Sequence, residues 1–210
     1  MSRADARGRT LELLAEVGIP DPESRIDNYP HQFSGGMAQR VVAAMALACS
    51  PKLLIADEAT TALDVTVQGQ LLDLIGDLAR ERDMSVLLIT HDLGVVADLA
   101  DRVAVMYAGE IVETGRLDDV FASPQHPYTE GLIRAIPRNI RRSGDLPTIP
   151  GVVPSPWDWP PHCHFADRCE HAAEGCRDGA VALAPSAAGM SRCLRIGEID
   201  LRGVRAGASS

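Results

Sequence analysis

Two short apolar runs separated by an amphipathic segment constrain the fold of this chain more than any other feature. Residues 52–57 (KLLIAD) and 84–89 (MSVLLI) have the length and apolar content of buried strands. Between them, residues 66–82 place valine, leucine and isoleucine side chains on one side of a predicted helix. Further helices are predicted at 34–48, before the first strand, and at 93–99, after the second. The order helix, strand, helix, strand, helix indicates an α/β layer with parallel central strands.

Shorter predicted elements and a proline-rich stretch lie outside this layer. The elements are helices at 10–18, 24–28, 117–121 and 128–136, and a hairpin of residues 102–107 and 110–113 that turns at Ala108-Gly109. Prolines crowd residues 147–161, which is typical of a linker or of irregular structure. We therefore expect five parts: a helical subdomain (1–50), an α/β half (51–115), a helical linker (116–150), a small irregular cysteine-rich extension (151–200) and a tail (201–210).

Charge and hydropathy exclude several classes of protein. Lys and Arg number 20 and Asp and Glu 29, a net charge of −9, which argues against a surface that binds nucleic acid. The longest apolar run, residues 41–49, is far shorter than the roughly 20 residues of a transmembrane helix. Residues 1–10 lack the apolar core of a secretion signal, so we expect the cysteines to be reduced or metal-bound rather than paired.

The lysine content excludes one common nucleotide site. The only lysine is Lys52, which lies between Pro51 and Leu53 and outside any glycine-rich loop. A phosphate-binding P-loop of the form G-x-x-x-x-G-K-[ST] needs a lysine within such a loop. These 210 residues therefore contain no P-loop.

Acidic residues and a histidine follow the two predicted strands. Asp57 and Glu58 end the first, at the sheet edge where open α/β sheets bind ligands. One carboxylate there suits Mg²⁺, and the other suits a base that orients an attacking water. His91 follows the second strand, which puts an imidazole at the same edge as a candidate phosphate sensor. The alternative is structural: the acids cap the next turn and the histidine only donates a hydrogen bond.

A glycine pair opens the predicted helix at 34–48. Ser34 is its expected N-cap, and Gly35 and Gly36 leave the first backbone N–H groups open to an anion. An ordinary serine-capped helix start explains the same residues equally simply.

The order of these pieces resembles the ABC transporter ATPases. Residues 32–40 (QFSGGMAQR) resemble the signature motif of that family, and residues 53–60 (LLIADEAT) resemble its Walker B strand. Residues 61–64 (TALD) resemble the D-loop, and His91 resembles the switch histidine. The resemblance covers roughly residues 10–115 and implies part of a P-loop NTPase-type ATPase domain, namely its helical subdomain and a parallel-sheet half. Met37, where glutamine is common, and Phe33, where leucine is common, depart from the signature.

The resemblance implies a role for each matched residue. Asp57 would hold the Mg²⁺ of ATP, Glu58 would activate the hydrolytic water, and His91 would contact the γ-phosphate. Asp64 would link the two ATP sites of a dimer. The signature residues expected at the ATP held by the opposite subunit are Ser34, Gly35, Gly36 and Gln39.

The second half of the chain narrows the resemblance to importers of dipeptides, oligopeptides or nickel. Residues 123–129 (SPQHPYT), 151–156 (GVVPSP) and 163–169 (CHFADRC) look like the C-terminal extension of their ATP-binding subunits, although His162 stands where glycine is more usual. The partners implied are a second ATP-binding subunit with a P-loop, two membrane permeases and, indirectly, an extracytoplasmic peptide-binding protein. The implied location is the cytoplasmic face of the membrane.

Four cysteines gather in the extension, while Cys49 ends an apolar helix and is expected to be a buried thiol. The four are Cys163, Cys169, Cys176 and Cys193. Their spacings lack the tight C-x₂-C pairs of a zinc ribbon, whereas iron–sulfur ligation tolerates wider spacing. Resemblance to the importer extension implies a 4Fe-4S cluster with a structural role. Zinc, to which His162, His164 or His171 could add a ligand, and free or paired thiols stay open as alternatives.

The leading hypothesis is the C-terminal portion of the ATP-hydrolysing subunit of a peptide importer. Without a P-loop we expect no ATPase activity from the chain alone, and we expect an uncovered apolar edge and face on its sheet. Truncation of a longer protein is the simplest explanation. The alternative is a non-catalytic interaction or regulatory module that carries an iron–sulfur cluster. A DNA-repair ATPase of the same superfamily is disfavoured, because long coiled-coil insertions and tight zinc pairs are both missing from the sequence.

Overall fold

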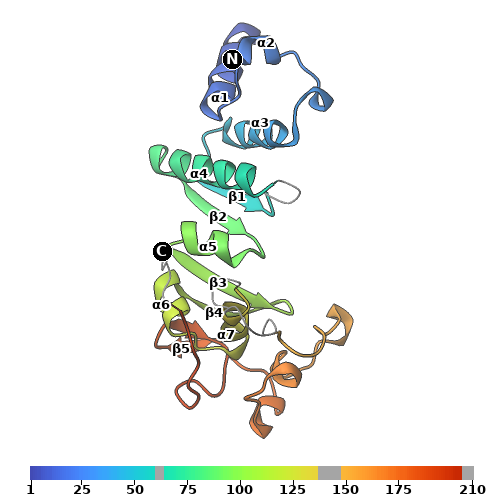
Figure 1. The fold of residues 1–210 in the computed structure, drawn as a ribbon, viewed down its shortest axis with the longest axis vertical. Coiled ribbons are helices and arrows are strands. Elements are labelled where there is room, and N and C mark those ends of the chain that lie inside the picture. The colour runs from blue at the N-terminus through green and yellow to red at the C-terminus, as the bar shows by residue number, and fades with distance from the viewer. Residues whose placement is uncertain (60–63, 137–147, 205–210) are drawn as a thin grey trace. The chain divides into compact units, whose positions relative to one another are not determined.

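The computed structural model describes residues 1–59, 64–136 and 148–204 (Figure 1). They form two compact units, unit 1 (Met1–His91) and unit 2 (Asp92–Ser210). Three predicted segments lie partly outside the described residues. They are residues 61–63 of the expected D-loop, the start of the proline-rich stretch at Pro147 and the end of the expected tail. The five-part division made from the sequence stays a prediction.

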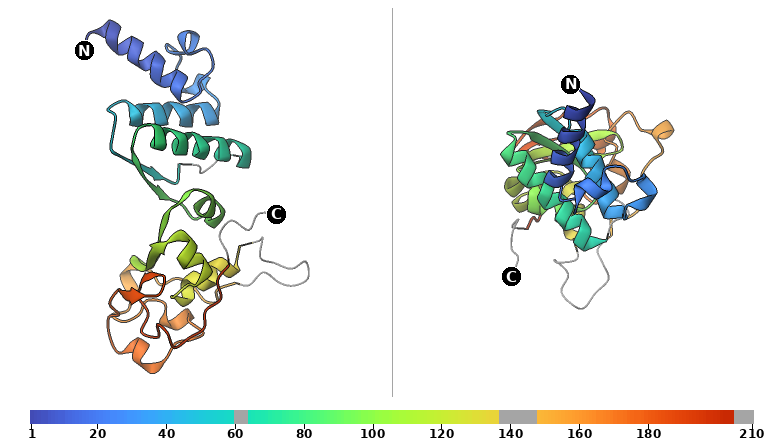
Figure 2. Two further views of the ribbon diagram at one scale, coloured as in Figure 1. Left: turned by 90° about the vertical axis from the view of Figure 1, so that its left-hand side faces the viewer. Right: turned by 90° about the horizontal axis from the view of Figure 1, so that it is seen from above.

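Unit 1 is the predicted α/β layer together with the predicted helical segments (Figure 2). Its elements are α1 (Arg3–Glu16), α2 (Pro22–Arg25), η1 (Pro30–Gln32), α3 (Gly35–Leu47), β1 (Leu53–Asp57), α4 (Val65–Glu81) and β2 (Ser85–Ile89). Strands β1 and β2 pair in parallel, with Leu53 opposite Ser85 and Asp57 opposite Ile89. The prediction of parallel strands joined by a helix is therefore confirmed.

Helix α1 begins earlier than the apolar spacing predicted. The hydroxyl of Ser2 accepts from the Asp5 N–H, and the Asp5 carboxylate accepts from the Ser2 N–H. This reciprocal capping box satisfies two N–H groups that a helix start otherwise leaves open. It begins the helix at Arg3 rather than at residue 10.

The core of unit 1 lies between its helices and one face of β1. It consists of Leu13, Leu14, Val17, Ile19, Ala44, Leu47, Leu54, Leu71, Ile75, Leu78 and Met84. In β1, Leu54 and Ala56 are buried, whereas Leu53 and Ile55 are 53% and 59% exposed. On β2, Ile89 is 44% exposed. The prediction of fully buried strands is thus wrong for the described residues, because only one face of β1 meets the helices. The exposed face agrees with the expected uncovered apolar surface.

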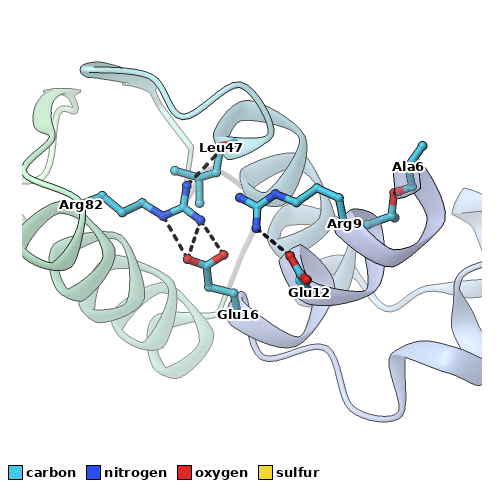
Figure 3. A network of polar contacts seen from close by, with 7 residues as sticks. Ala6, Arg9, Glu12, Glu16, Leu47 and Arg82 are labelled. Atoms are coloured by element: carbon cyan, nitrogen blue, oxygen red, sulfur yellow. Dashed lines mark hydrogen bonds and ion pairs between the residues drawn. The ribbon is translucent and has the colours of Figure 1, made fainter. Parts of the chain in front are cut away.

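One arginine joins three helices of unit 1. Figure 3 shows the Arg82 guanidinium between the carboxylate of Glu16, at the end of α1, and the carbonyl of Leu47, at the end of α3. Its Nε donates to Glu16 at 2.9 Å and its Nη1 to Leu47 at 3.3 Å. The Arg82 and Glu16 side chains are only 17% and 27% exposed. Arg82 therefore links the C-terminal ends of α1, α3 and α4 at a partly desolvated point.

Unit 2 is built on an antiparallel sheet rather than on the parallel layer. Its elements are α5 (Leu93–Leu99), β3 (Arg102–Tyr107), β4 (Glu110–Arg116), α6 (Leu117–Ala122), α7 (Pro127–Arg134), η3 (Pro156–Asp158), η4 (Ala166–Arg168), η5 (Glu174–Arg177), β5 (Ala184–Ser186) and β6 (Gly189–Ser191). The strand order is β3-β4-β6-β5. The predicted hairpin is confirmed, and it turns at Ala108 and Gly109, both at positive φ.

The cysteine-rich extension is less irregular than predicted. Strand β6 pairs with β4, so residues 189–191 continue the sheet begun by the hairpin. The ring of Trp159 packs on the hairpin turn so closely that a Cβ on Gly109 would lie 2.1 Å from it. The extension therefore folds onto the hairpin.

A buried carboxylate holds the loop between α6 and α7. Glu113 on β4 is 0% exposed and accepts the backbone N–H groups of Gln125 and His126 at 2.7 and 3.0 Å. Burial raises the pKa of this carboxyl group. His126 is the N-cap of α7, since its Nδ1 accepts the N–H of Tyr128 at 3.1 Å. Pro127 follows at the first helical position, where its missing N–H costs nothing.

We predict that Arg82→Met destabilises unit 1 by about 2 kcal/mol, because the Glu16 carboxylate keeps its partial burial and loses its charged partner. Arg9→Met is the matched control, since Arg9 pairs with Glu12 on the exposed side of α1 and such pairs contribute under about 1 kcal/mol (Figure 3). Hydrogen exchange of α1 and α3 amides measures the difference. Equal protection in the two variants would contradict the role assigned to Arg82.

Candidate functional site

The ends of β1 and β2 bring a carboxylate and an imidazole together. Glu58 follows β1, and its N–H donates to the carbonyl of Ile89 at 2.9 Å. Its Oε1 lies 3.2 Å from Nδ1 of His91, which follows β2 after two residues. Both side chains are open to solvent, with 51% of Glu58 and 80% of His91 exposed. The predicted meeting of these two residues at one sheet edge is therefore found in the structure.

The backbone of Glu58 adopts an uncommon conformation. Its φ is +44°, in the left-handed region that a residue with a Cβ enters at a cost of roughly 1–2 kcal/mol. This conformation turns the chain sharply after β1, and the bond to Ile89 holds the turn in place. Asp21, Ser50, Asp83 and Ala108 have a similar φ, so this conformation by itself does not distinguish Glu58 from other turn residues.

Asp57 is the last residue of β1 and lies opposite Ile89. Its side chain is exposed, and within the described parts of the chain it forms no hydrogen bond or ion pair with Glu58 or His91. The structure thus places both acids and the imidazole at one strand end but joins only Glu58 and His91 directly. An exposed carboxylate at this position can take a hard cation such as Mg²⁺.

The start of α3 combines a cap with a close helix contact. The Ser34 hydroxyl accepts the N–H of Met37 at 3.4 Å, as expected of an N-cap. A Cβ on Gly36 would lie only 2.6 Å from Cγ1 of Val67 on α4. Gly36 therefore lets the start of α3 pack against the start of α4, a requirement that the sequence alone did not show. Gln39 lies one helical turn further along α3.

Asp64 is the N-cap of α4. Its Oδ1 accepts the N–H groups of Thr66 and Val67 at 3.1 and 3.0 Å. The residues before it in the expected D-loop lie outside the described residues. Asp64 therefore helps to position Val67, the residue that meets Gly36, and so it links the start of α4 to the start of α3.

Four cysteines of unit 2 line one small cavity of about 20 Å³ that is partly open to solvent. They are Cys163, Cys169, Cys176 and Cys193. No three of their sulfurs lie within 4.8 Å of one another in the described chain. Four thiolates on one zinc ion would be about 3.8 Å apart, given Zn–S bonds near 2.3 Å. The spacing therefore does not match a preformed zinc site. Cys49 belongs to unit 1 and is exposed, which corrects the expectation of a buried thiol.

Burial and crowding shape the chemistry of these thiols. Burial raises the pKa of Cys169 to about 11, and neighbouring cysteines contribute in the same direction. Burial also raises the pKa of Cys163 and of Cys193. Two backbone N–H groups already point to sulfur: Arg195 donates to Cys193 at 3.4 Å and Ala173 to Cys176 at 3.5 Å. These donors favour sulfur that carries negative charge.

The histidines considered as zinc ligands have other contacts. Nδ1 of His164 lies 2.8 Å from the Ala108 carbonyl, and Nδ1 of His162 lies 3.2 Å from the Cys163 carbonyl. Only His171 of the three lines the cysteine cavity. The sequence missed His126, which also lines it, because nothing in the motif SPQHPYT distinguishes a ring facing a cavity from a helix cap.

A second group of ligand atoms in unit 2 is already satisfied. Glu130, Glu170 and His171 place one ligand atom each within 4.8 Å of the others. However, Glu130 accepts the N–H of Arg202 at 2.8 Å, and Glu170 pairs with Arg134 at 3.4 Å. These contacts supply a hydrogen-bond or ion-pair partner to each of the two carboxylates, so neither needs a metal ion.

We predict that Gly36→Ala destabilises unit 1 by about 1–3 kcal/mol, because the new methyl group collides with Val67. Helix propensity alone would favour alanine by roughly 1 kcal/mol, so the sign of the change reports the collision. The double variant Gly36→Ala, Val67→Ala should recover most of the loss in a urea-unfolding cycle. Additive effects of the two substitutions would contradict the contact.

Comparisons with known proteins bear on both halves of the chain. Residues 3–61 match the ABC transporter family, and residues 112–176 match the oligopeptide/dipeptide transporter C-terminal region. The dipeptide transport ATP-binding protein DppD of Haemophilus influenzae is 57% identical over 171 residues, which are 81% of this chain and 52% of the relative. DppD of Bacillus subtilis is 55% identical over 84% of this chain and 52% of the relative. DppD of Escherichia coli is 50% identical over 91% and 59%.

The chain spans little more than half the length of these curated relatives. A solved dimeric ATP-binding cassette, bound to ADP and Pi after hydrolysis, is 32% identical over 56% of this chain and 49% of the other, with a TM-score of 0.49. Because that superposition is loose, the assignment depends on the two sequence matches. By both matches the chain belongs to the ABC transporter ATP-binding proteins that carry the oligopeptide/dipeptide transporter C-terminal region.

Proposed function

We propose that these residues form part of the ATP-hydrolysing subunit of a peptide importer. The observation that carries the proposal is the contact between Glu58 and His91 at the ends of two parallel strands. The names of the relatives, dipeptide transport ATP-binding proteins, support a peptide as the transported solute. The matched C-terminal region supports the same class of solute.

In the proposed mechanism Glu58 accepts a proton from the attacking water. Its exposed carboxylate can reach a water at this edge, and its bond to His91 limits the directions in which it points. His91 then presents its other ring nitrogen, Nε2, to the γ-phosphate. Asp57 would hold Mg²⁺, which would supply positive charge to the phosphates when bound.

The start of α3 serves the other half of an ATP site. Gly35 and Gly36 expose backbone N–H groups at the N-terminal end of a helix of 13 residues, where the helix dipole favours an anion. In the family arrangement this anion is the γ-phosphate of an ATP held by an opposite subunit. The packing of Gly36 on Val67 supports this role, because it fixes the direction of the helix end.

A partner must supply the P-loop that these residues lack. We infer that a homodimer of this chain has no competent ATP site and that a P-loop-containing second subunit completes at most one. Two membrane permeases, an extracytoplasmic peptide-binding protein and attachment at the cytoplasmic face of the membrane complete the proposed assembly. Among the described helices, none has both the length and the apolar content needed to cross a membrane.

The cysteine cavity is the proposed seat of a 4Fe-4S cluster. Four thiols face one space, their sulfurs are spread more widely than one zinc ion needs, and two backbone N–H groups already bond to sulfur. Cys163, Cys169, Cys176 and Cys193 would hold the cluster, which would act as a cross-link within the extension. The strands β5 and β6 and the short 3₁₀ turns have little core of their own, so such a cross-link is physically reasonable.

We predict that Glu58→Gln lowers ATP turnover at least 100-fold in a subunit that contains both these residues and a P-loop, while ATP binding is retained. Glu81→Gln, an exposed residue at the end of α4, is the matched control and should leave turnover unchanged. The chain of 210 residues alone should hydrolyse no ATP. Retained turnover in Glu58→Gln would remove Glu58 from its role, and micromolar ATP binding by the chain alone would contradict its dependence on a partner.

We predict that the chain purified without oxygen is brown and holds iron and acid-labile sulfide in equal amounts, about four of each. Replacing any one of the four cavity cysteines by serine should lower both contents, because each supplies one ligand. Cys49→Ser, an exposed cysteine outside the cavity, is the matched control and should change neither. A colourless protein with one zinc ion per chain would refute the cluster.

A further inference from the structure

His126 is a buried histidine on the wall of the cysteine cavity. Its side chain is almost fully enclosed, with 2% of the residue exposed, and it lines the cavity together with the four cysteines. It lies between α6 and α7 on a loop whose backbone N–H groups are held by the carboxylate of Glu113. Its position relative to the cavity is therefore fixed by the fold of unit 2 rather than by the cavity itself.

The hydrogen bonds of His126 determine which ring nitrogen carries the proton. The N–H of Tyr128 donates to Nδ1 at 3.1 Å, so Nδ1 offers its lone pair. In a neutral imidazole the proton then lies on Nε2, which is a donor. A flip of the ring would lose the bond from Tyr128, and the ring of Phe165, 5.8 Å away between centroids, limits other rotations.

The Nε2–H group has no hydrogen-bond acceptor among the residues that the structure describes. Among the described residues, the fully buried side-chain atoms without a hydrogen-bond partner are the hydroxyl oxygens of Thr129 and Ser186. The Nε2–H of His126 is not one of them, so this donor is open to a group held in the cavity.

The His126 ring borders the cavity. Two cysteines of the cavity wall already accept backbone N–H groups at sulfur, Cys193 from Arg195 and Cys176 from Ala173. The wall is thus organised to donate hydrogen bonds to negatively charged sulfur.

We propose that His126 donates its Nε2–H to a sulfur atom of the metal centre held by the four cysteines, and so acts as a positioning residue for that centre. The inference deepens the proposed function and depends on its cluster. Hydrogen bonds to the sulfurs of an iron–sulfur centre disperse negative charge, which favours the reduced form and raises the reduction potential. His126 therefore couples the α7 loop to the electronic state of the extension.

Two substitutions separate this donor from the role of His126 as a helix cap. His126→Asn keeps a side-chain oxygen that can accept the N–H of Tyr128 but is too short to reach the place of Nε2. His126→Gln places an amide N–H₂ about as far from the backbone as Nε2 and restores the donor. His162→Asn is the control, because His162 is the neighbour of Cys163 in the chain but does not line the cavity.

The test is a redox titration of the full chain, prepared without oxygen, with iron and sulfide measured in each sample. At equal iron and sulfide content, His126→Asn should lower the equilibrium constant for one-electron reduction of the centre about tenfold. Its reduction potential should therefore fall by about 59 mV. His126→Gln should recover most of the potential, and His162→Asn should match the original chain. An unchanged potential in a fully loaded His126→Asn would overturn the proposal.

Two further outcomes are decisive. If His126→Asn takes up no iron, pulsed electron paramagnetic resonance of the original chain labelled with ¹⁵N-histidine decides: a coupling from a histidine nitrogen to the reduced centre supports the donor, and its absence overturns it. If the original chain itself takes up no iron and sulfide, the proposed cluster fails, and the role of His126 fails with it. Metal analysis reveals that failure before any potential is measured.

Discussion

The parallel register of β1 and β2 is the constraint on which the candidate ATP site depends. Asp57 stands opposite Ile89, and the N–H of Glu58 bonds to the Ile89 carbonyl one step beyond the last pair. A slip of one residue would turn Leu54 and Ala56 out of the core and separate Glu58 from His91. The same strand register therefore buries one face of β1 and brings Glu58 next to His91 at the strand end.

What the sequence could predict was local in origin. Periodicity identified the parallel pair, the crossover helix and the Ala108-Gly109 hairpin, because each depends on residues close together in the chain. Burial of β1 was misjudged, since an apolar strand looks the same whether one face or both are covered. Strands β5 and β6 have only three residues each, too few for a pattern, and they form through pairing with β4. The contact of Gly36 with Val67 joins two separate motifs and needs the tertiary structure.

The SPQHPYT segment shows why a recognisable motif need not reveal what its residues do. Glu113, which lies outside the motif, accepts two of its N–H groups, and Pro127 and His126 start α7. These roles explain the residue types as loop and helix-cap chemistry. They also leave one edge of the His126 ring at the cysteine cavity, a consequence of the loop position that no spacing in the motif encodes.

Both candidate sites contain a side chain whose position is set by backbone bonds from elsewhere in the fold. The N–H of Glu58 donates to the Ile89 carbonyl, which holds the sharp turn after β1 and brings the Glu58 carboxylate to His91. The Glu113 carboxylate accepts the N–H of His126, and the His126 ring accepts the N–H of Tyr128. In each unit the backbone therefore fixes the functional side chain before any ligand is present, which is the preorganisation that binding and catalytic sites require.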